Sequence, residues 1–474
     1  MEGRSRVALI TVSDGRASVH AQIAAFAGEA EARLASRLEA LGNEVVRAEI
    51  VCTPDLGVSV ARRAAALHPD LTIINIPVWS FPKFAVRVAS EISGPLVLYS
   101  NLDPQYPGMV GMLAAGGALD QLGRAHGRVC GRPDDRETIE QLQSFITAGA
   151  AVRGLAGSAF GRIGGRSMGM NTAVAATDQW MKIFGVDVEE IDQFELVRRA
   201  ESIASSRAIA GREWFERYAA GVHYDGIRLT PELLERQIRV YCAAKDLVEE
   251  LRLDFCGIKG QPELTDHYCT MDIAEACLND PYDWEGPKVP VVCATEADMD
   301  GALTMQILKT LGACPVLFAD VRHYHADLGI WDLCNSGQHA TWYAQRSQDP
   351  EENLSRVDLY PAEFYFPAGG ASVRHLAAPG EMTFARLSRL DGRYRLQVLR
   401  GEFETYDDAT NERLMRASTY TWPHAFTRFA ASADEILARY GANHIHAVPG
   451  EHVETLRRVS AFLGIEFDGF GSAR

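Results

Sequence analysis

The sequence lacks any paired arrangement of cysteines. Its 474 residues include nine cysteines, an odd number, and none of them forms a CxxC motif. Isolated cysteines in a long acidic chain are typical of reduced, mostly buried thiols rather than of a disulfide framework or a zinc ribbon. The sequence therefore predicts neither disulfide bonds nor a structural zinc site.

The chain also lacks an excess of basic residues and any long apolar run. Its 47 lysines and arginines and 63 aspartates and glutamates give a formal net charge of −16, which argues against nucleic acid or an anionic membrane as the main partner. No stretch approaches the roughly 20 apolar residues that a membrane span needs. The first residues, MEGRSRVALITVSDGR, enter a strand-like run too short for a signal peptide, so we expect a cytoplasmic protein.

Nucleotide-binding motifs are absent as well. The glycine-rich segment FGRIGGRSMGMNTAV (160–174) lacks both the GK[ST] ending of a P-loop and the GxGxxG spacing of a dinucleotide-binding fold. Neither nucleotide class is therefore supported. The segment remains a candidate for a tight turn that exposes its backbone and presents Met168 to a ligand or a domain interface.

Residues 6–150 alternate strand and helix patterns. Apolar runs such as VALITVS (7–13) and LTIINIPVW (71–79) predict strands, and helical patterns such as 19–41 separate them. This alternation predicts a doubly wound parallel sheet, that is, a flavodoxin-like α/β domain over residues 1–157. The residues expected just past the strands, at the ligand edge of this sheet, are Asp14, Gly15, Arg16, Trp79 and Asn101.

Arg16 and Trp79 are the most informative residues at this edge. The guanidinium of Arg16 can bind hydroxyl groups or an anion through two parallel hydrogen bonds, and the indole of Trp79 offers a flat apolar wall. The alternative is that both side chains only cover the edge of the sheet.

A second α/β domain is predicted over residues 158–342, and a β-rich third domain over residues 343–474. The second domain is more helical than the first, with one long helical pattern over 194–218. The third alternates apolar and polar residues with the period of antiparallel strands, and Asp391-Gly392 is a good hairpin turn. The predicted fold class is therefore two doubly wound α/β domains followed by a β-rich C-terminal domain.

The segment 289–325 has the pattern of a βαβ unit. Two apolar, strand-like runs flank a helical pattern at about 299–311. Each run ends in a carboxylate, Glu296 after the first and Asp320 after the second. Because open α/β sheets bind ligands beyond the carboxyl ends of their strands, the two carboxylates can converge on one small ligand. The alternative is that Glu296 caps the helix and Asp320 ends a strand in solvent.

Two histidine clusters stand out among the 13 histidines. HYH at 323–325 follows Asp320, and HIH at 444–446 lies in a strand-like segment, where His444 and His446 share one face. Two carboxylates and one imidazole form a ligand set for a divalent ion such as manganese, which leaves positions for substrate oxygens and water. Each histidine is alternatively an ordinary, hydrogen-bonded surface group.

Several short motifs are spread over the chain. They are GRIGGRSMGM (161–170), GIKGQPELTD (257–266), CATEADMDG (293–301), FADVR (318–322), STYTWP (418–423) and GANH (441–444). On these motifs the chain resembles the L-fucose isomerase family, related to L-arabinose isomerases, over nearly its full length. The 24-residue spacing from Glu296 to Asp320 is the most specific feature. Family members are similar in having two α/β domains, a β-rich C-terminal domain and a homo-oligomeric assembly, hexameric in the best known cases.

The resemblance implies manganese-dependent isomerisation of an aldose to a ketose. It implies that Glu296, Asp320 and His444 are the metal ligands, with Mn²⁺ as the ion and Co²⁺ or Mg²⁺ as alternatives. An aspartate at the second position resembles the fucose-type branch, because arabinose isomerases have glutamate there. Arg16 and Trp79 would reach the site from a neighbouring subunit. The residues that match sugar-lining positions are Arg16, Trp79, Met168, Trp422 and Asn443, and Gln261 is a further substrate-binding candidate.

The chemistry fits these residue types independently of the resemblance. An open-chain aldose must lose the weakly acidic proton on C2 and regain one on C1, through a cis-enediol. A divalent ion that holds O1 and O2 polarises the carbonyl and stabilises the enediolate, and a carboxylate on each side can move the proton. Glu296 and Asp320 are the candidate catalytic residues, and their individual roles stay open.

The chain departs from the family pattern around the substrate. The loop before Gln261 lacks an additional short segment, and the sequence after His444 diverges. The favoured substrate is therefore a sugar of the L-fucose or D-arabinose type, and the identity of the aldose stays open. One alternative is a 6-modified aldose, such as a 6-sulfo sugar. The basic residues available to bind its anionic group are Arg16, Lys259, His446 and His452.

Two functions of other classes are alternatives. The chain could be a catalytically inactive sugar-binding protein on the isomerase scaffold, but the intact set of Glu296, Asp320 and His444 argues against this. A metal-dependent hydrolase would need a second metal and further carboxylates near the first, and the sequence shows no such cluster.

Overall fold

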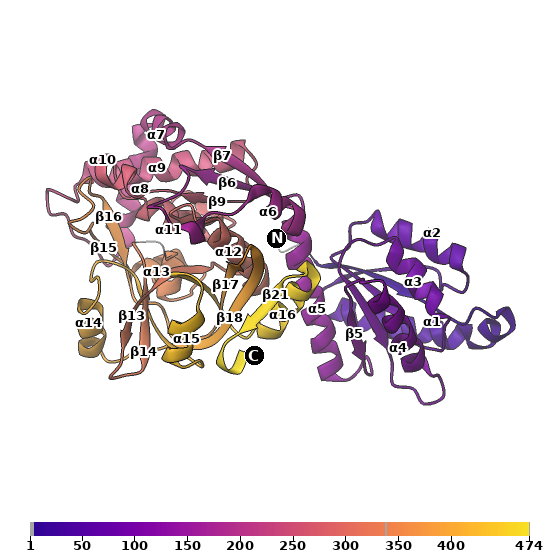
Figure 1. Cartoon of the computed structure of the whole chain (residues 1–474). Coiled ribbons are helices and arrows are strands. Elements are labelled where there is room, and N and C mark those ends of the chain that lie inside the picture. The colour runs from indigo at the N-terminus through magenta and orange to yellow at the C-terminus, as the bar shows by residue number, and fades with distance from the viewer. Residues whose placement is uncertain (1–3, 337–338, 474) are drawn as a thin grey trace. The chain divides into compact units, whose positions relative to one another are not determined.

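The computed structural model describes residues 4–336 and 339–473 (Figure 1). The chain forms two compact units, and each is described by itself. Unit 1 consists of Met1–Gly154 and Glu454–Ile465, and unit 2 of Leu155–Val453 and Glu466–Arg474. Unit 2 therefore contains the predicted middle domain together with most of the predicted C-terminal domain.

Unit 1 is built on a five-stranded parallel sheet. Its strand order is β2-β1-β3-β4-β5. The strands are β1 (Arg6–Thr11), β2 (Glu44–Arg47), β3 (Leu71–Asn75), β4 (Leu96–Ser100) and β5 (Gly127–Cys130). This order is that of flavodoxin-like, doubly wound sheets, so the architecture predicted for the first domain is confirmed.

Helices cover both faces of this sheet. Val7 and Leu9 of β1 pack with α1 and α5 on one face, whereas Ala8 and Ile10 pack with α2, α3 and α4 on the other. The helices of unit 1 are α1 (Ala17–Ala40), α2 (Pro54–Ala65), α3 (Pro82–Ser90), α4 (Gly108–Gln121), α5 (Arg136–Leu155) and α16 (Val453–Leu463). The Phe462 ring of α16 lies 6.0 Å from that of Phe145, between ring centroids.

Unit 2 contains a four-stranded parallel sheet of order β12-β9-β6-β7. Its strands are β6 (Ala159–Ile163), β7 (Asp187–Ile191), β9 (Phe255–Ile258) and β12 (Val292–Thr295). The helices that accompany it are α6 (Thr177–Phe184), α7 (Gln193–Ser202), α8 (Ser205–Tyr218), α9 (Pro231–Glu250), α10 (Glu263–His267), α11 (Asp272–Asn279) and α12 (Met299–Gly312). The single helix predicted over 194–218 is wrong, because Ile203 and Ala204 adopt extended ψ angles of 132° and 134° between α7 and α8.

The second sheet of unit 2 closes on itself. Its order is β17-β20-β13-β14-β19-β18-β21, and β17 also pairs with β18, so the first six strands form a closed ring. The strands are β13 (Leu317–His325), β14 (Ile330–Cys334), β17 (Gly380–Leu390), β18 (Arg393–Phe403), β19 (His424–Phe429), β20 (His444–Pro449) and β21 (Glu466–Gly469). Asp391 (φ 50°) and Gly392 (φ 73°) form the predicted hairpin turn between β17 and β18.

The predicted βαβ unit is wrong. β12 lies in the parallel sheet beside β9, whereas β13 lies in the closed ring, where it pairs antiparallel with β14 and β20. The long β13 pairs with the next strand, β14, and with the distant β20, and sequence periodicity does not reveal a partner so far along the chain. The prediction that Asp320 ends its strand is also wrong, because β13 continues past Asp320 to His325, whereas Glu296 does follow the end of β12. The two carboxylates are therefore carried by different sheets.

Side chains alternate between the inside and the outside of the ring. Leu317, Ala319, Leu333, Ala425 and Ile445 belong to one apolar core cluster. Residues directly opposite in antiparallel strands point to the same face. A row of polar residues that are paired across β20, β13, β14 and β19 therefore lies on the outer face, and its members are His444, Asp320, Cys334 and His424.

Short elements complete unit 2. They are β8 (Gly221–Val222), β10 (Tyr282–Asp283), β11 (Gly286–Pro287), β15 (Asp358–Pro361), β16 (Ala371–Arg374), α13 (Pro350–Leu354), α14 (Asp408–Arg416) and α15 (Ala433–Arg439). None of the helices in the described ranges has the length and apolar character that crossing a bilayer requires.

Candidate metal centre

The three residues predicted as metal ligands meet in unit 2. His444 Nε2 lies 3.1 Å from Glu296 Oε2 and 3.6 Å from Asp320 Oδ1. Direct pairing of Asp320 with His444 across β13 and β20 brings two of them together, and the turn after β12 supplies Glu296. His444 and Glu296 are buried, with exposed fractions of 1% and 7%.

The backbone at Glu296 is held in an unusual conformation. Glu296 and Ala297 both have left-handed φ angles, 58° and 50°, a region that costs residues with a Cβ about 1 kcal/mol or more. Gly257 of β9 makes room for this turn, because a Cβ there would lie 2.9 Å from the Ala297 Cα atom. Two consecutive strained residues at a buried carboxylate point to a functional constraint rather than to a simple connection.

The alternative role of Glu296, as a helix cap, is excluded by its neighbour. The N-cap residue of α12 is Asp298, whose side chain accepts a hydrogen bond of 3.0 Å from the Gly301 N–H. Asp320 likewise does not end in solvent. Its Oδ2 accepts from Asn335 Nδ2 at 3.1 Å and its Oδ1 from Asn443 Nδ2 at 3.0 Å.

A buried ion pair fixes the second nitrogen of His444. Asp298 Oδ2 lies 2.6 Å from His444 Nδ1, and Arg386 of β17 binds both oxygens of Asp298 at 2.5 and 3.1 Å. Arg386 also donates to the Thr172 carbonyl at 2.9 Å. A carboxylate on one imidazole nitrogen orients the ring and leaves the other nitrogen for a ligand bond.

The charges in this cluster perturb one another. Burial by itself lowers the pKa of His444, but the carboxylates of Asp298, Glu296 and Asp320 outweigh it and raise that pKa to about 10. Burial raises the pKa of Asp298, but the Arg386 guanidinium and His444 hold it well below its usual range. Burial raises the pKa of Asp320, partly opposed by His444. Carboxylates concentrated in this way attract a cation.

The donor atoms fit a divalent ion of the manganese type. Glu296 Oε2 and His444 Nε2 are buried and form an ion pair at 3.1 Å, yet within the described ranges neither atom makes a hydrogen bond of good geometry. Buried polar atoms normally find a partner, and an ion shared by these atoms would supply one. Two carboxylates and one imidazole suit Mn²⁺ and related ions.

Four of the predicted sugar-binding residues lie in unit 2. Asn443 donates to Asp320, as described, so it also positions a proposed ligand. Trp422 is buried, and its Nε1 has no hydrogen-bond partner among the described residues. Met168 (φ 43°) is half exposed in the predicted tight turn. The Ser167 hydroxyl in that turn donates to the Gln261 carbonyl at 3.1 Å, which joins the Met168 turn to the Gln261 loop.

Arg16 and Trp79 lie in unit 1, after the carboxyl ends of β1 and β3. Arg16 binds the Asp14 carboxylate through its Nε at 2.9 Å and its Nη2 at 2.6 Å. The guanidinium of Arg16 is therefore already neutralised within its own unit. The contribution of both residues to a site shared between subunits stays a prediction.

Three other basic residues considered for an anionic sugar are engaged elsewhere. Lys259 Nζ lies 2.7 Å from Glu263. His446 is fully buried, and burial lowers its pKa well below the usual value, so the ring is neutral. His452 Nε2 lies 3.0 Å from the Pro449 carbonyl.

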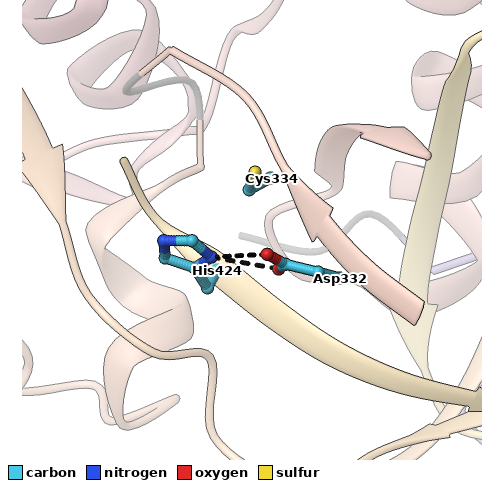
Figure 2. Close-up of side chains that lie close together, drawn as sticks. All are labelled: Asp332, Cys334 and His424. Carbon is cyan, nitrogen blue, oxygen red and sulfur yellow. Dashed lines mark hydrogen bonds and ion pairs between the residues drawn. The ribbon is translucent and has the colours of Figure 1, made fainter. Parts of the chain in front are cut away.

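A second group of ligand-type side chains lies on the same outer face. Asp332, Cys334 and His424 are buried, and their ligand atoms lie within 4.8 Å of one another (Figure 2). His424 Nδ1 is 3.0 Å from both Asp332 oxygens, and its Nε2 is 3.0 Å from the Thr419 carbonyl. Because both ring nitrogens face acceptors, we interpret this group as a buried histidine–aspartate pair that ties β14 to β19.

Two residues of the proposed centre were missed by sequence reasoning. Asp298 carries a helix-cap signal, which does not indicate that it also binds a histidine. Arg386 offered a clearer signal, since it interrupts the apolar alternation of MTFARLSRL (382–390). An arginine at a buried strand position needs a carboxylate partner, and that partner is Asp298.

Comparison with known proteins gives a consistent family match. Three family models match: "L-fucose isomerase, first N-terminal domain" over residues 4–157, the second N-terminal domain over 252–313 and the C-terminal domain over 333–470. The chain is 26% identical over 471 residues to an L-fucose isomerase of Haemophilus influenzae, covering 83% of this chain and 79% of the relative. The chain is 26% identical to an L-fucose isomerase of Klebsiella pneumoniae and 27% identical to one of Salmonella paratyphi C, in each case over 451 residues. Both matches cover 79% of this chain and 76% of the relative.

Proposed function

Because the chain belongs to the L-fucose isomerase family, we propose that its aldose–ketose isomerase activity is metal-dependent and acts on an L-fucose- or D-arabinose-type sugar. Glu296, Asp320 and His444 would hold the ion, Mn²⁺ in the first place and Co²⁺ or Mg²⁺ as alternatives. Such an ion, when bound, polarises the sugar carbonyl and stabilises negative charge on the enediolate oxygens.

The carboxylates of this chain move the proton. Glu296 and Asp320 approach His444 Nε2 from two different elements, the β12–α12 turn and strand β13. A carboxylate in each position can take the proton from C2 of the open-chain aldose or return it to C1. The Asn335 and Asn443 amides keep Asp320 oriented while it does so.

One observation carries the proposal. Glu296, Asp320 and His444 lie up to 148 positions apart in the sequence. In the structure, His444 Nε2 lies 3.1 Å from Glu296 Oε2 and 3.6 Å from Asp320 Oδ1. Two of these atoms are buried without a hydrogen bond of good geometry in the described ranges. A protein that only bound a sugar would not need this costly arrangement of charges.

The family supports a proposal for the substrate and the assembly. The relatives carry the name L-fucose isomerase, which favours L-fucose or the similarly configured D-arabinose. We further propose a homo-oligomer, a hexamer by family resemblance, in which Arg16 and Trp79 complete the site of a neighbouring subunit. We also propose a cytoplasmic location.

Removal of the ion and of one ligand tests the activity. Glu296→Gln keeps the size of the side chain and removes its charge, so we expect ketose formation to fall by about a hundredfold or more. Treatment with EDTA should abolish activity, and Mn²⁺ should restore it. The measurement is ketose formation from L-fucose, D-arabinose and a 6-sulfo aldose, with unfolding followed by circular dichroism.

Glu381→Gln serves as the matched control, because Glu381 is an exposed glutamate on β17. It should leave activity unchanged. Ketose formation by metal-free protein, or by Glu296→Gln at the unmodified rate, would contradict the proposal. Metal binding without conversion of any aldose would favour the inactive sugar-binding protein instead.

A further inference from the structure

Arg322 occupies a special position on the strand that carries Asp320. In the pairing of β13 with β14, Val321 is opposite Leu333 and His323 is opposite Asp332, so Arg322 is the extra residue of a β-bulge. Bulges occur next to active sites, where they redirect a side chain. Arg322 is therefore aimed by the same strand that positions a proposed metal ligand.

The bulge directs Arg322 onto Trp422. The guanidinium carbon lies 4.9 Å from the centroid of the Trp422 ring, a cation–π contact. Arg322 Nη2 donates to the Thr419 hydroxyl at 3.0 Å. The guanidinium is also close enough to act electrostatically on the Asp320 carboxylate. The planar guanidinium of Arg322 and the apolar ring of Trp422 are thus in contact beside the candidate metal centre.

Most of the donor capacity of Arg322 stays available. The side chain is exposed, and in the part of the chain that the structure describes no ion pair joins it to a carboxylate. A guanidinium has five N–H donors; its bond to Thr419 uses one of them, and a second faces the Tyr365 hydroxyl. The arginine and the lysine that the sequence offers for an anionic sugar are both neutralised, Arg16 by Asp14 and Lys259 by Glu263.

We propose that Arg322, held in position by Trp422, forms a specificity subsite for the end of the sugar remote from its carbonyl. The guanidinium takes a pair of oxygens on that end, and the buried Trp422 ring, which the guanidinium covers, holds it in position. The two oxygens come either from neighbouring hydroxyls or from a terminal oxyanion. This inference rests on the proposed isomerase function.

Kinetics of Arg322→Gln and Arg322→Lys test the subsite. We expect Arg322→Gln to raise KM by about tenfold to a hundredfold, the range of a lost charge-assisted hydrogen bond, with little change in kcat. Arg322→Lys should show a smaller rise in KM than Arg322→Gln, since a lysine ammonium keeps the charge but cannot donate two parallel hydrogen bonds. Arg393→Gln, an exposed arginine on the β17–β18 hairpin, should leave KM unchanged.

Two inhibitors distinguish the source of the oxygens. A hexitol and its analogue with a terminal carboxylate are compared in both proteins by their inhibition constants. An equal loss of affinity in Arg322→Gln indicates hydroxyls, and a loss about tenfold greater for the carboxylate indicates an oxyanion. Both results support the subsite.

Mn²⁺ affinity, measured by electron paramagnetic resonance, separates recognition from structural support. The inference predicts that it is the same in the wild type and in Arg322→Gln. Unchanged KM and inhibition constants in an active Arg322→Gln would overturn the subsite, as would a parallel loss of Mn²⁺ affinity. Wild-type protein that binds Mn²⁺ but converts no aldose would instead overturn the proposed function.

Discussion

The imidazole of His444 is engaged on both of its edges. Nδ1 lies 2.6 Å from the Asp298 carboxylate, and Nε2 faces Glu296 and Asp320. Arg386 compensates the charge of Asp298, so that the carboxylate stays ionised although it is fully buried. The histidine is thereby held in the orientation that a metal ligand needs.

Replacing Asp298 tests this support. Asp298→Asn keeps the size of the side chain but weakens the bonds to His444 and Arg386, so we expect Mn²⁺ affinity to fall by about tenfold to a hundredfold. Titration with Mn²⁺, followed by electron paramagnetic resonance, measures the effect. Asp327→Asn, an exposed aspartate after β13, should bind Mn²⁺ as the wild type does. An unaltered affinity in Asp298→Asn would mean that Asp298 does not position His444.

At the scale of elements, the centre depends on the close approach of β9 to the turn after β12. Gly257 faces the Ala297 backbone, and an added Cβ would come within 2.9 Å of the Ala297 Cα atom. Backbone cannot move aside as a flexible side chain can. A side chain at position 257 would therefore push β9 and the turn that carries Glu296 apart.

Gly257→Ala should consequently displace Glu296. We expect it to lower the free energy of unfolding by about 1–3 kcal/mol, the usual cost of overpacking, and to lower kcat as well. Urea unfolding and ketose formation measure the two effects. Gly28→Ala is the control, because no atom lies within 4 Å of a Cβ at this helical position. If Gly257→Ala unfolds and reacts like the wild type, this packing does not position Glu296.

Sequence patterns predicted individual elements better than their partners. The sequence predicts a strand before Glu296 and one before Asp320, because apolar periodicity is a local property, but β13 extends beyond Asp320 to His325. Their parallel pairing was wrong, since β13 pairs instead with β20, which lies more than a hundred residues further along. The sequence predicts that the two carboxylates converge because it predicts adjacent parallel strands, and that pairing is absent. The family resemblance, not the pattern, implies His444 as the third ligand. Asp298 and Arg386 were missed because each serves a partner that only the folded chain reveals.

At the scale of the molecule, unit 2 joins two kinds of sheet at one centre. The parallel sheet contributes Glu296 and Asp298 at the end of β12, and the closed ring contributes Asp320, Arg386 and His444. The ring has no free strand edge between β17 and β18. Its strand pairing fixes the register of Asp320 on β13 and His444 on β20, which favours a preorganised site.

The net charge of −16 does not decide what this centre binds. Three carboxylates, one imidazole and the Arg386 guanidinium set the local field, and the distant charges are screened over about 10 Å at ordinary ionic strength. A divalent cation would offset the excess negative charge of the centre. The sugar, which is neutral at its carbonyl end, would then be recognised by the ion and by side chains such as Trp422 and Arg322.

The most direct test of the metal centre is an anomalous-scattering map from crystals grown with Mn²⁺. The account predicts one strong peak that contacts Glu296, Asp320 and His444, with the Asp298 carboxylate on the far side of the imidazole. It also predicts no peak between Asp332, Cys334 and His424, where both histidine nitrogens are engaged. A map without a peak at the first position, or with the peak at the second, would contradict it.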